Sequence, residues 1–177
     1  MDETLVGRLV YGLAKAVAIT GGTVLCAVVL IVVVSVVGRA LIPLGLSAVP
    51  GDFEIVQFGV LFAIFCALPL TQYVRGHADV SVLTDHLPLR VVVIIEVVMD
   101  VLMLAATVFI LWRFGVGMLD KYSNREMTFI LHMPLWWTYA AGMLGAVCMV
   151  IVSAYCVVRS IVNAASRTPQ RPEAGIF

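Results

Sequence analysis

Four long apolar runs, separated by segments that hold nearly all of the charged residues, constrain this chain more than any other feature. The runs cover residues 16–38, 55–74, 91–112 and 134–158. Because a helix rises 1.5 Å per residue, about 20 apolar residues are enough to cross the roughly 30 Å of hydrocarbon in a bilayer. The runs therefore predict an all-α membrane protein with four transmembrane helices.

The composition points to lipid rather than water as the solvent of this chain. Of its 177 residues, 62% are hydrophobic and 12% are charged, and the formal net charge is zero. A soluble core of this size does not enclose so many apolar side chains. Lys and Arg are not clustered, which argues against a nucleic-acid-binding surface. We expect one membrane domain over residues 1–162 and a flexible cytoplasmic tail over 163–177, which is too polar to order itself.

The positive charges predict the orientation. With four spans both termini share one side of the membrane, and that side carries seven Lys and Arg residues: Arg8, Lys15, Arg75, Arg90, Arg159, Arg167 and Arg171. The other side carries four, namely Arg39, Arg113, Lys121 and Arg125. Since cytoplasmic segments are enriched in Lys and Arg, we expect both termini in the cytoplasm.

Proline and aromatic residues predict where the later spans end. Pro134 indicates that the fourth helix begins there. Trp136, Trp137 and Tyr139 would then lie at the outer interface together with Trp112 from the end of the third span, as in an aromatic belt. Between the second and third spans, Val80, Val82, Leu83 and Leu87 could form one apolar face, which predicts a short interfacial helix.

Two acidic residues interrupt the third run. Glu96 and Asp100 are four residues apart, so they share one helix face, roughly 9 and 15 Å along the axis from Arg90. One interpretation is a proton or cation relay, because ionisable groups inside a bilayer are functional candidates. The other is that they bond to polar side chains of neighbouring helices and hold them in register. Asp100 has no evident basic partner in the chain, which suggests one on another subunit.

A second charged group frames the loop between the first two runs. Arg39 ends the first run, and Asp52 and Glu54 open the second, so all three are expected at the same membrane face. An ion pair here would join spans one and two, with a role that is more geometric than energetic.

The segment Arg75-Gly76-His77-Ala78-Asp79-Val80 follows the second span. We expect Arg75, His77 and Asp79 either to lie among lipid headgroups or to dock a partner. A metal site is not expected, since the histidines lack the paired spacing of metal ligands on one helix. Ser35, Ser153 and Ser160 have no His and Asp companions at a catalytic spacing, and the four cysteines lie in apolar runs. We therefore expect no enzyme activity, and neither a cofactor nor a metal in this chain.

From Gly12 to Ile161 the chain resembles the small membrane subunit of tripartite ATP-independent periplasmic (TRAP) transporters. The resemblance is carried by Gly38-Arg39, by Pro50-Gly51-Asp52-Phe53-Glu54, by Arg75 to Val80 with Leu87-Pro88, and by His132-Met133-Pro134-Leu135-Trp136. Many members have a Trp before a pair of acids, where this chain has Gly51-Asp52-Phe53-Glu54.

The resemblance implies a small scaffold subunit in the bacterial inner membrane. Its partners would be a large membrane subunit, which holds the substrate and sodium sites, and a periplasmic binding protein that delivers an organic acid. Uptake would be driven by an ion gradient. The resemblance assigns no substrate site to the small subunit, and we expect Arg39, Asp52, Glu54, Arg75, His77, Asp79, Glu96, Asp100, Pro134 and Trp136 to be structural or subunit-interface residues.

Two other functions can be weighed. A quinone-linked redox enzyme would need cysteines in the outer loops or histidines inside spans, and the sequence has neither. A small oligomeric channel lined by Glu96 and Asp100 stays open as the alternative.

Overall fold

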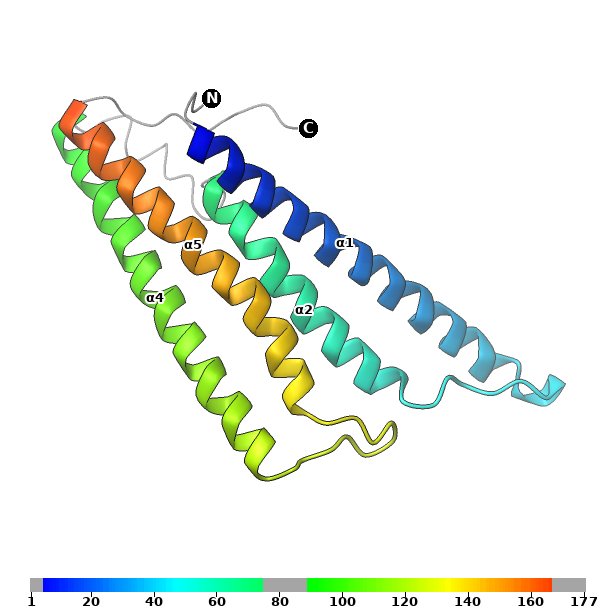
Figure 1. Ribbon diagram of the computed structural model, residues 1–177. Helices are drawn as coiled ribbons and strands as arrows, with labels where there is room; N and C mark the ends of the chain where they lie inside the picture. Colours follow the sequence, from blue (N-terminus) through cyan, green and yellow to red (C-terminus); the bar gives the residue numbers. More distant parts are fainter. Residues whose placement is uncertain (1–4, 75–88, 167–177) are drawn as a thin grey trace.

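The computed structural model describes residues 5–74 and 89–166, and these residues are almost entirely helical (Figure 1). The long helices are α1 (Leu5–Ala40), α2 (Asp52–Tyr73), α4 (Leu89–Ser123) and α5 (Trp136–Ser166), and a short 3-10 helix, η1 (Ile42–Leu44), follows α1. All four long helices have the length and hydropathy needed to cross a membrane. The predicted all-α architecture is confirmed, and it contains four helices long and apolar enough to span a membrane.

The helices form an open row rather than a closed bundle. Helix α4 packs against α5, α5 packs against α2, and α2 packs against α1, whereas α1 and α5 touch only slightly (Figure 1). Helix α5 is the most enclosed, with 39% of its membrane-length stretch buried, and α1 is the least enclosed, with 11%. Helices α1 and α4 therefore form the two edges of the row, and their outward faces are free for lipid or for another protein.

The two ends of the row differ in what they contain. The start of α1 and the end of α5 lie together at one end, which we call the terminal end (Figure 1). The segments 41–51 and 124–135 lie at the opposite end, which we call the loop end. This arrangement follows from an even number of crossings. Which end faces the cytoplasm stays a prediction.

A stripe of small residues explains how α1 packs. Apart from Gly38 near its end, its buried positions recur every seven residues, at Gly7, Ala14, Gly21, Val28 and Ser35. A seven-residue period keeps one narrow seam against a partner helix when the two helices wind around each other with a left-handed twist. The approach is close, since a Cβ on Gly21 would lie 2.5 Å from Cβ of Cys66 on α2. Most of the other side chains of α1 are exposed.

Several helices extend beyond the predicted spans. Helix α1 starts well before residue 16, and α4 continues eleven residues past Trp112, because the apolar sequence resumes after Arg113. Helix α5 begins at Trp136, two residues after Pro134, and extends to Ser166, so residues 163–166 of the predicted tail are helical. Helix α2 matches its predicted run and passes through Pro69. The predicted interfacial helix lies in 75–88, outside the described residues.

Candidate functional site

Asp52 joins α2 to α1 at the loop end. Its Oδ2 atom accepts hydrogen bonds from Ser35 Oγ, at 2.6 Å, and from the guanidinium of Arg39, with which it also forms an ion pair. Its Oδ1 atom accepts from the backbone N–H of Phe53 at 2.8 Å. The Arg39 side chain is 56% exposed, and such pairs contribute little to stability. The contact therefore mainly sets where α1 ends relative to α2.

Glu54 does not take part in this contact but holds the other neighbour of α2. Its two carboxylate oxygens accept hydrogen bonds from the backbone N–H groups of Ile130, at 2.8 Å, and Leu131, at 3.0 Å. Glu54 is only 7% exposed, so these bonds form in a nearly closed site. Of the two acids that open α2, it is Asp52 that pairs with Arg39 in the described part of the chain. Glu54 anchors the segment between α4 and α5 instead.

The segment that Glu54 holds is itself tightly folded. Thr128 N donates to Met133 O at 2.9 Å and Leu135 N donates to Glu126 O at 2.9 Å, which makes a short hairpin. Gly51 lies against this hairpin with φ of +75°, and a Cβ there would lie 2.6 Å from Cγ of Leu131. Glycine is thus required at position 51 both by its backbone conformation and by the space available.

Pro134 and Trp136 complete the loop end. Pro134 pairs with Met127 across the hairpin, and its carbonyl accepts from Trp137 N at 3.2 Å. The ring of Trp136 packs edge-on against Tyr122 of α4, with centroids 5.8 Å apart. Tyr122, not Trp112, is therefore the α4 residue at the level of Trp136. Trp112 lies ten residues earlier on the helix, about 15 Å away along the axis, so it does not share the level of Trp136 as the sequence predicted.

Polar and aromatic side chains join the helices near the terminal end. Asp100 is buried and accepts a hydrogen bond from Ser160 Oγ of α5. The guanidinium of Arg159 lies over the ring of Tyr73, 5.8 Å from its centroid, and Tyr73 stacks on Tyr155. This partner for Asp100 lies in the same chain, so the suggested partner on another subunit is not required. The arrangement agrees with the structural interpretation of this acid.

The same contacts correct the depth assigned to the acids of α4. Asp100 lies beside Ser160, immediately after Arg159, which is the first charged residue after the apolar part of α5. Asp100 therefore lies at the margin of the apolar region rather than deep within it. Glu96, one turn earlier and half-buried, lies further toward the terminal end. Lys15 lies over the ring of Tyr11 on α1, at the opposite edge of the row.

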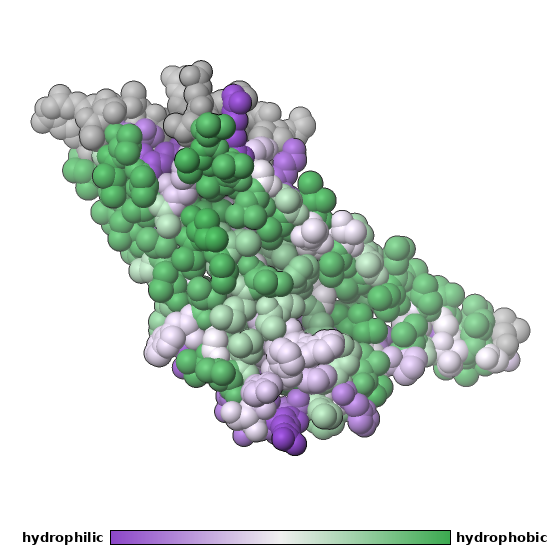
Figure 2. Space-filling view, in the orientation of Figure 1, coloured by the Kyte–Doolittle hydropathy of each residue, from purple (hydrophilic) through white to green (hydrophobic). Residues whose placement is uncertain are grey.

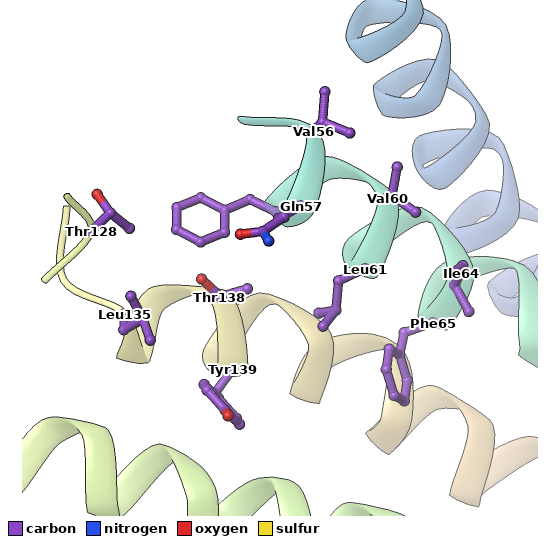
Figure 3. Close-up of a pocket in the computed structure, with 11 residues that line it drawn as sticks. Val56, Gln57, Val60, Leu61, Ile64, Phe65, Thr128, Leu135, Thr138 and Tyr139 are labelled. Atoms are coloured by element: carbon purple, nitrogen blue, oxygen red, sulfur yellow. The ribbon is translucent and has the colours of Figure 1, made fainter. Parts of the chain in front are cut away.

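An apolar groove of about 610 Å³ opens between α2 and α5 (Figure 3). Leu61, Ile64 and Phe65 line it from α2, Thr138 and Tyr139 line it from the start of α5, and Leu135 lines it from just before α5. The Thr138 hydroxyl is buried and has no hydrogen-bond partner in the described part of the chain. No lining residue is charged. The groove therefore suits an apolar chain better than a small carboxylic acid.

Three predicted site residues, Arg75, His77 and Asp79, lie outside the described residues, and their roles stay predictions. Within the described ranges, no group of three His, Cys, Asp or Glu side chains is arranged to hold a metal ion. The structure thus brings the other predicted residues into two groups, one at each end of the row.

Comparison with known families shows which kind of protein contains these two groups of residues. The family model for the DctQ component of tripartite ATP-independent periplasmic transporters matches residues 28–163, which span the last part of α1 and nearly all that follows. The chain belongs to this family. The resemblance seen in the sequence is confirmed, and a DctQ component is a membrane part of a transporter, not a member of an enzyme family. Neither a curated protein nor a solved structure gives a significant match.

Two features of this DctQ chain were missed in its sequence. Ser35, the buried donor to Asp52, belongs to the seven-residue stripe of α1, which is visible in the sequence once that period is sought. The contact from Glu54 to Ile130 and Leu131 joins residues more than seventy positions apart through backbone groups. Because backbone N–H groups carry no sequence signal, that contact had no signature to find.

Proposed function

We propose that this chain is the small scaffold subunit of a TRAP transporter in a bacterial inner membrane, with both termini in the cytoplasm. It would work with a large membrane subunit and a periplasmic binding protein in the ion-gradient-driven uptake of an organic acid. Membership of the DctQ family supports this assignment. The detailed role follows from how the helices are held together.

The observation that carries the scaffold role is the double anchoring of α2. From its first turn, Asp52 holds α1 on one side and Glu54 holds the hairpin before α5 on the other. The row is thus fixed at the loop end, while the aromatic and polar contacts of Tyr73 and Asp100 join helices near the terminal end. A row held at both ends, with broad apolar faces on α1 and α4, suits a rigid support for a moving partner.

Substrate and coupling ions are assigned to the partner subunit. An organic acid needs cationic or hydrogen-bonding groups that replace its water shell. The groove between α2 and α5 offers mainly aliphatic and aromatic side chains. We therefore propose that the large subunit binds the acid and sodium, and that this chain takes no part in the chemistry of transport.

Reconstitution into liposomes tests the proposal. The large subunit and this chain, with the binding protein outside, should take up labelled organic acid when a sodium gradient is imposed. Omitting this chain should abolish uptake, and this chain alone should give neither solute uptake nor ion flux. Ion flux from the purified chain alone would overturn the scaffold role and favour a channel that uses Glu96 and Asp100.

A further inference from the structure

Arg113 is the one formal charge inside the apolar band of the described helices. The band is bounded by Lys15 and Arg39 on α1, begins after Glu54 on α2, and ends at Arg159 on α5. On α4 its limits are Asp100, bonded to Ser160, and Asp120, close to the level where Tyr122 meets Trp136. The limits on α4 are twenty residues apart, or about 30 Å, which matches the hydrocarbon thickness of a bilayer. Figure 2 shows the same pattern, a hydrophobic band between hydrophilic groups at the two ends.

The position of Arg113 within this band follows from helix geometry and packing. It precedes Asp120 by seven residues and follows Asp100 by thirteen, so it lies about 10 Å from one limit and about 20 Å from the other. Packing against α5 agrees, because a Cβ on Gly142 would lie 3.0 Å from the ring of the adjacent Phe114. Gly142 is six residues, about 9 Å, inside α5. The sequence placed Arg113 at the end of the third span, whereas the fold places it inside the apolar band.

Arg113 is exposed on the surface of an edge helix and lacks a partner there. Among residues 5–74 and 89–166, no hydrogen bond, ion pair or contact with an aromatic ring reaches its guanidinium. Side chains on a helix lean toward its N-terminus, which on α4 is the terminal end. The nearer limit of the band lies in the opposite direction. Arg113 is therefore poorly placed to reach the nearer headgroups by extending its side chain.

The surface beside Arg113 has the character of a protein interface. Phe109 and Trp112 are 58% and 61% exposed, and their rings contact each other with centroids 6.0 Å apart. Arginine and tryptophan are the residue types most enriched among those that dominate binding energy. Charged groups within membranes normally pair with a group of opposite charge or face a polar cavity.

We propose that Arg113 forms an ion pair with a carboxylate on an apolar helix of the large membrane subunit, so that this face of α4 is the surface that docks that subunit. The inference rests on the proposed function. A carboxylate fits best because its two oxygens match the paired N–H donors of a guanidinium. Phe109 and Trp112 would pack against the same partner helix and exclude lipid from the ion pair.

The substitution Arg113→Leu tests the docking surface. It removes the charge and makes α4 more apolar, so membrane insertion should be at least as efficient as in the wild type. Co-purification with the large subunit should weaken about 30-fold or more, because the partner carboxylate is left buried and unpaired. Arg8→Leu removes an exposed cation outside the band and should leave co-purification unchanged. Arg113→Lys should retain part of the affinity.

A charge exchange identifies the partner group. Arg113→Glu should abolish association, and one Asp or Glu in an apolar helix of the large subunit, changed to Arg, should restore it. A photo-crosslinking amino acid in place of Val116 should react with the large subunit, which tests the same face even if an Arg113 variant fails to fold.

The outcomes separate the two proposals. Unchanged co-purification of Arg113→Leu, with loss of bound anionic phospholipid instead, would overturn docking and assign Arg113 to a lipid phosphate. Absence of crosslinking from position 116 would also overturn it. If the wild-type chain itself fails to associate with the large subunit, the proposed function fails, and not only this inference.

Discussion

At the residue scale, the different roles of Asp52 and Glu54 follow from helix geometry. Residues i and i+2 of a helix point to nearly opposite sides, so two acids at this spacing do not serve one partner. Asp52 meets Ser35 and Arg39 of α1, whereas Glu54 meets Ile130 and Leu131. The sequence showed that the acids lie at a membrane boundary, but the direction in which each side chain points depends on the first turn of α2.

Replacement of Glu54 by Gln should loosen the hairpin between α4 and α5. The amide keeps one acceptor oxygen and presents an NH₂ group to the second N–H donor, so one of two bonds is lost in a nearly closed site. We expect the melting temperature in detergent to fall by about 2–4 °C and proteolysis within residues 124–135 to accelerate. Glu126→Gln, at a more exposed carboxylate of the same end, is the control. Equal effects of both variants would contradict the anchoring role.

Replacement of Asp100 by Asn should leave transport largely intact. The amide oxygen can still accept from Ser160, and hydrogen bonds between membrane helices contribute only about 0.6 kcal/mol on average. Uptake by the reconstituted complex should therefore stay close to that of the wild type, while Asp100→Leu should lower its thermal stability. Loss of uptake by Asp100→Asn with a normally assembled complex would support the proton or cation relay instead.

At the scale of the helices, close packing along one seam decides where α1 lies. Its buried positions follow a seven-residue period, and most of its other side chains face outward. Helices in lipid gain little from hydrophobic burial, so small residues that allow close approach are what bring them together. Gly145 on α5 shows the same feature, since a Cβ there would lie 2.7 Å from the backbone of Phe65.

Two adjacent glycines provide a matched test of this seam. A Cβ on Gly21 would meet Cβ of Cys66 at 2.5 Å, whereas a Cβ on Gly22 has nothing within 4 Å. We expect Gly21→Ala to destabilise the chain by about 1–3 kcal/mol, because α1 and α2 must move apart. Gly22→Ala should be neutral. Thermal unfolding in detergent measures both, and an equal response of the two variants would contradict the packing of α1 on α2.

At the scale of the whole molecule, the open row of helices leaves surfaces on which another protein can assemble. A closed bundle would hide most of its own surface, but here the edge helices α1 and α4 keep broad apolar faces outside. Some of that surface contacts lipid. The exposed Arg113 on α4 makes this edge the better candidate for a protein partner.

Cysteine labelling tests the predicted orientation. Asn124 lies at the loop end and Val6 at the terminal end, and both are exposed. In intact cells, Asn124→Cys should react with a membrane-impermeant thiol reagent, whereas Val6→Cys should react only after the inner membrane is opened. The native cysteines lie within the helices and provide the background measured on the wild type. The reverse pattern would invert the topology and place the hairpin in the cytoplasm.

By itself, the sequence determined the fold class, the number of spans and the family. Each of these depends on apolar runs about as long as a bilayer is thick and on charged residues between them, which are local properties. The buried stripe of α1 was also present in the sequence, as a repeat of seven. The extent of α4 could not be read from the sequence, because a single arginine followed by further apolar residues looks the same as the end of a span.

Only the tertiary structure decided which groups meet. The open order of the row, the contact of Glu54 with backbone groups of a distant hairpin, and the pairing of Asp100 with Ser160 all depend on relative positions of helices. The same is true of the depth of Arg113, since a level in the membrane is defined by what lies beside a residue on neighbouring helices. Hydropathy records how apolar each segment is, but not how segments are shifted along one another.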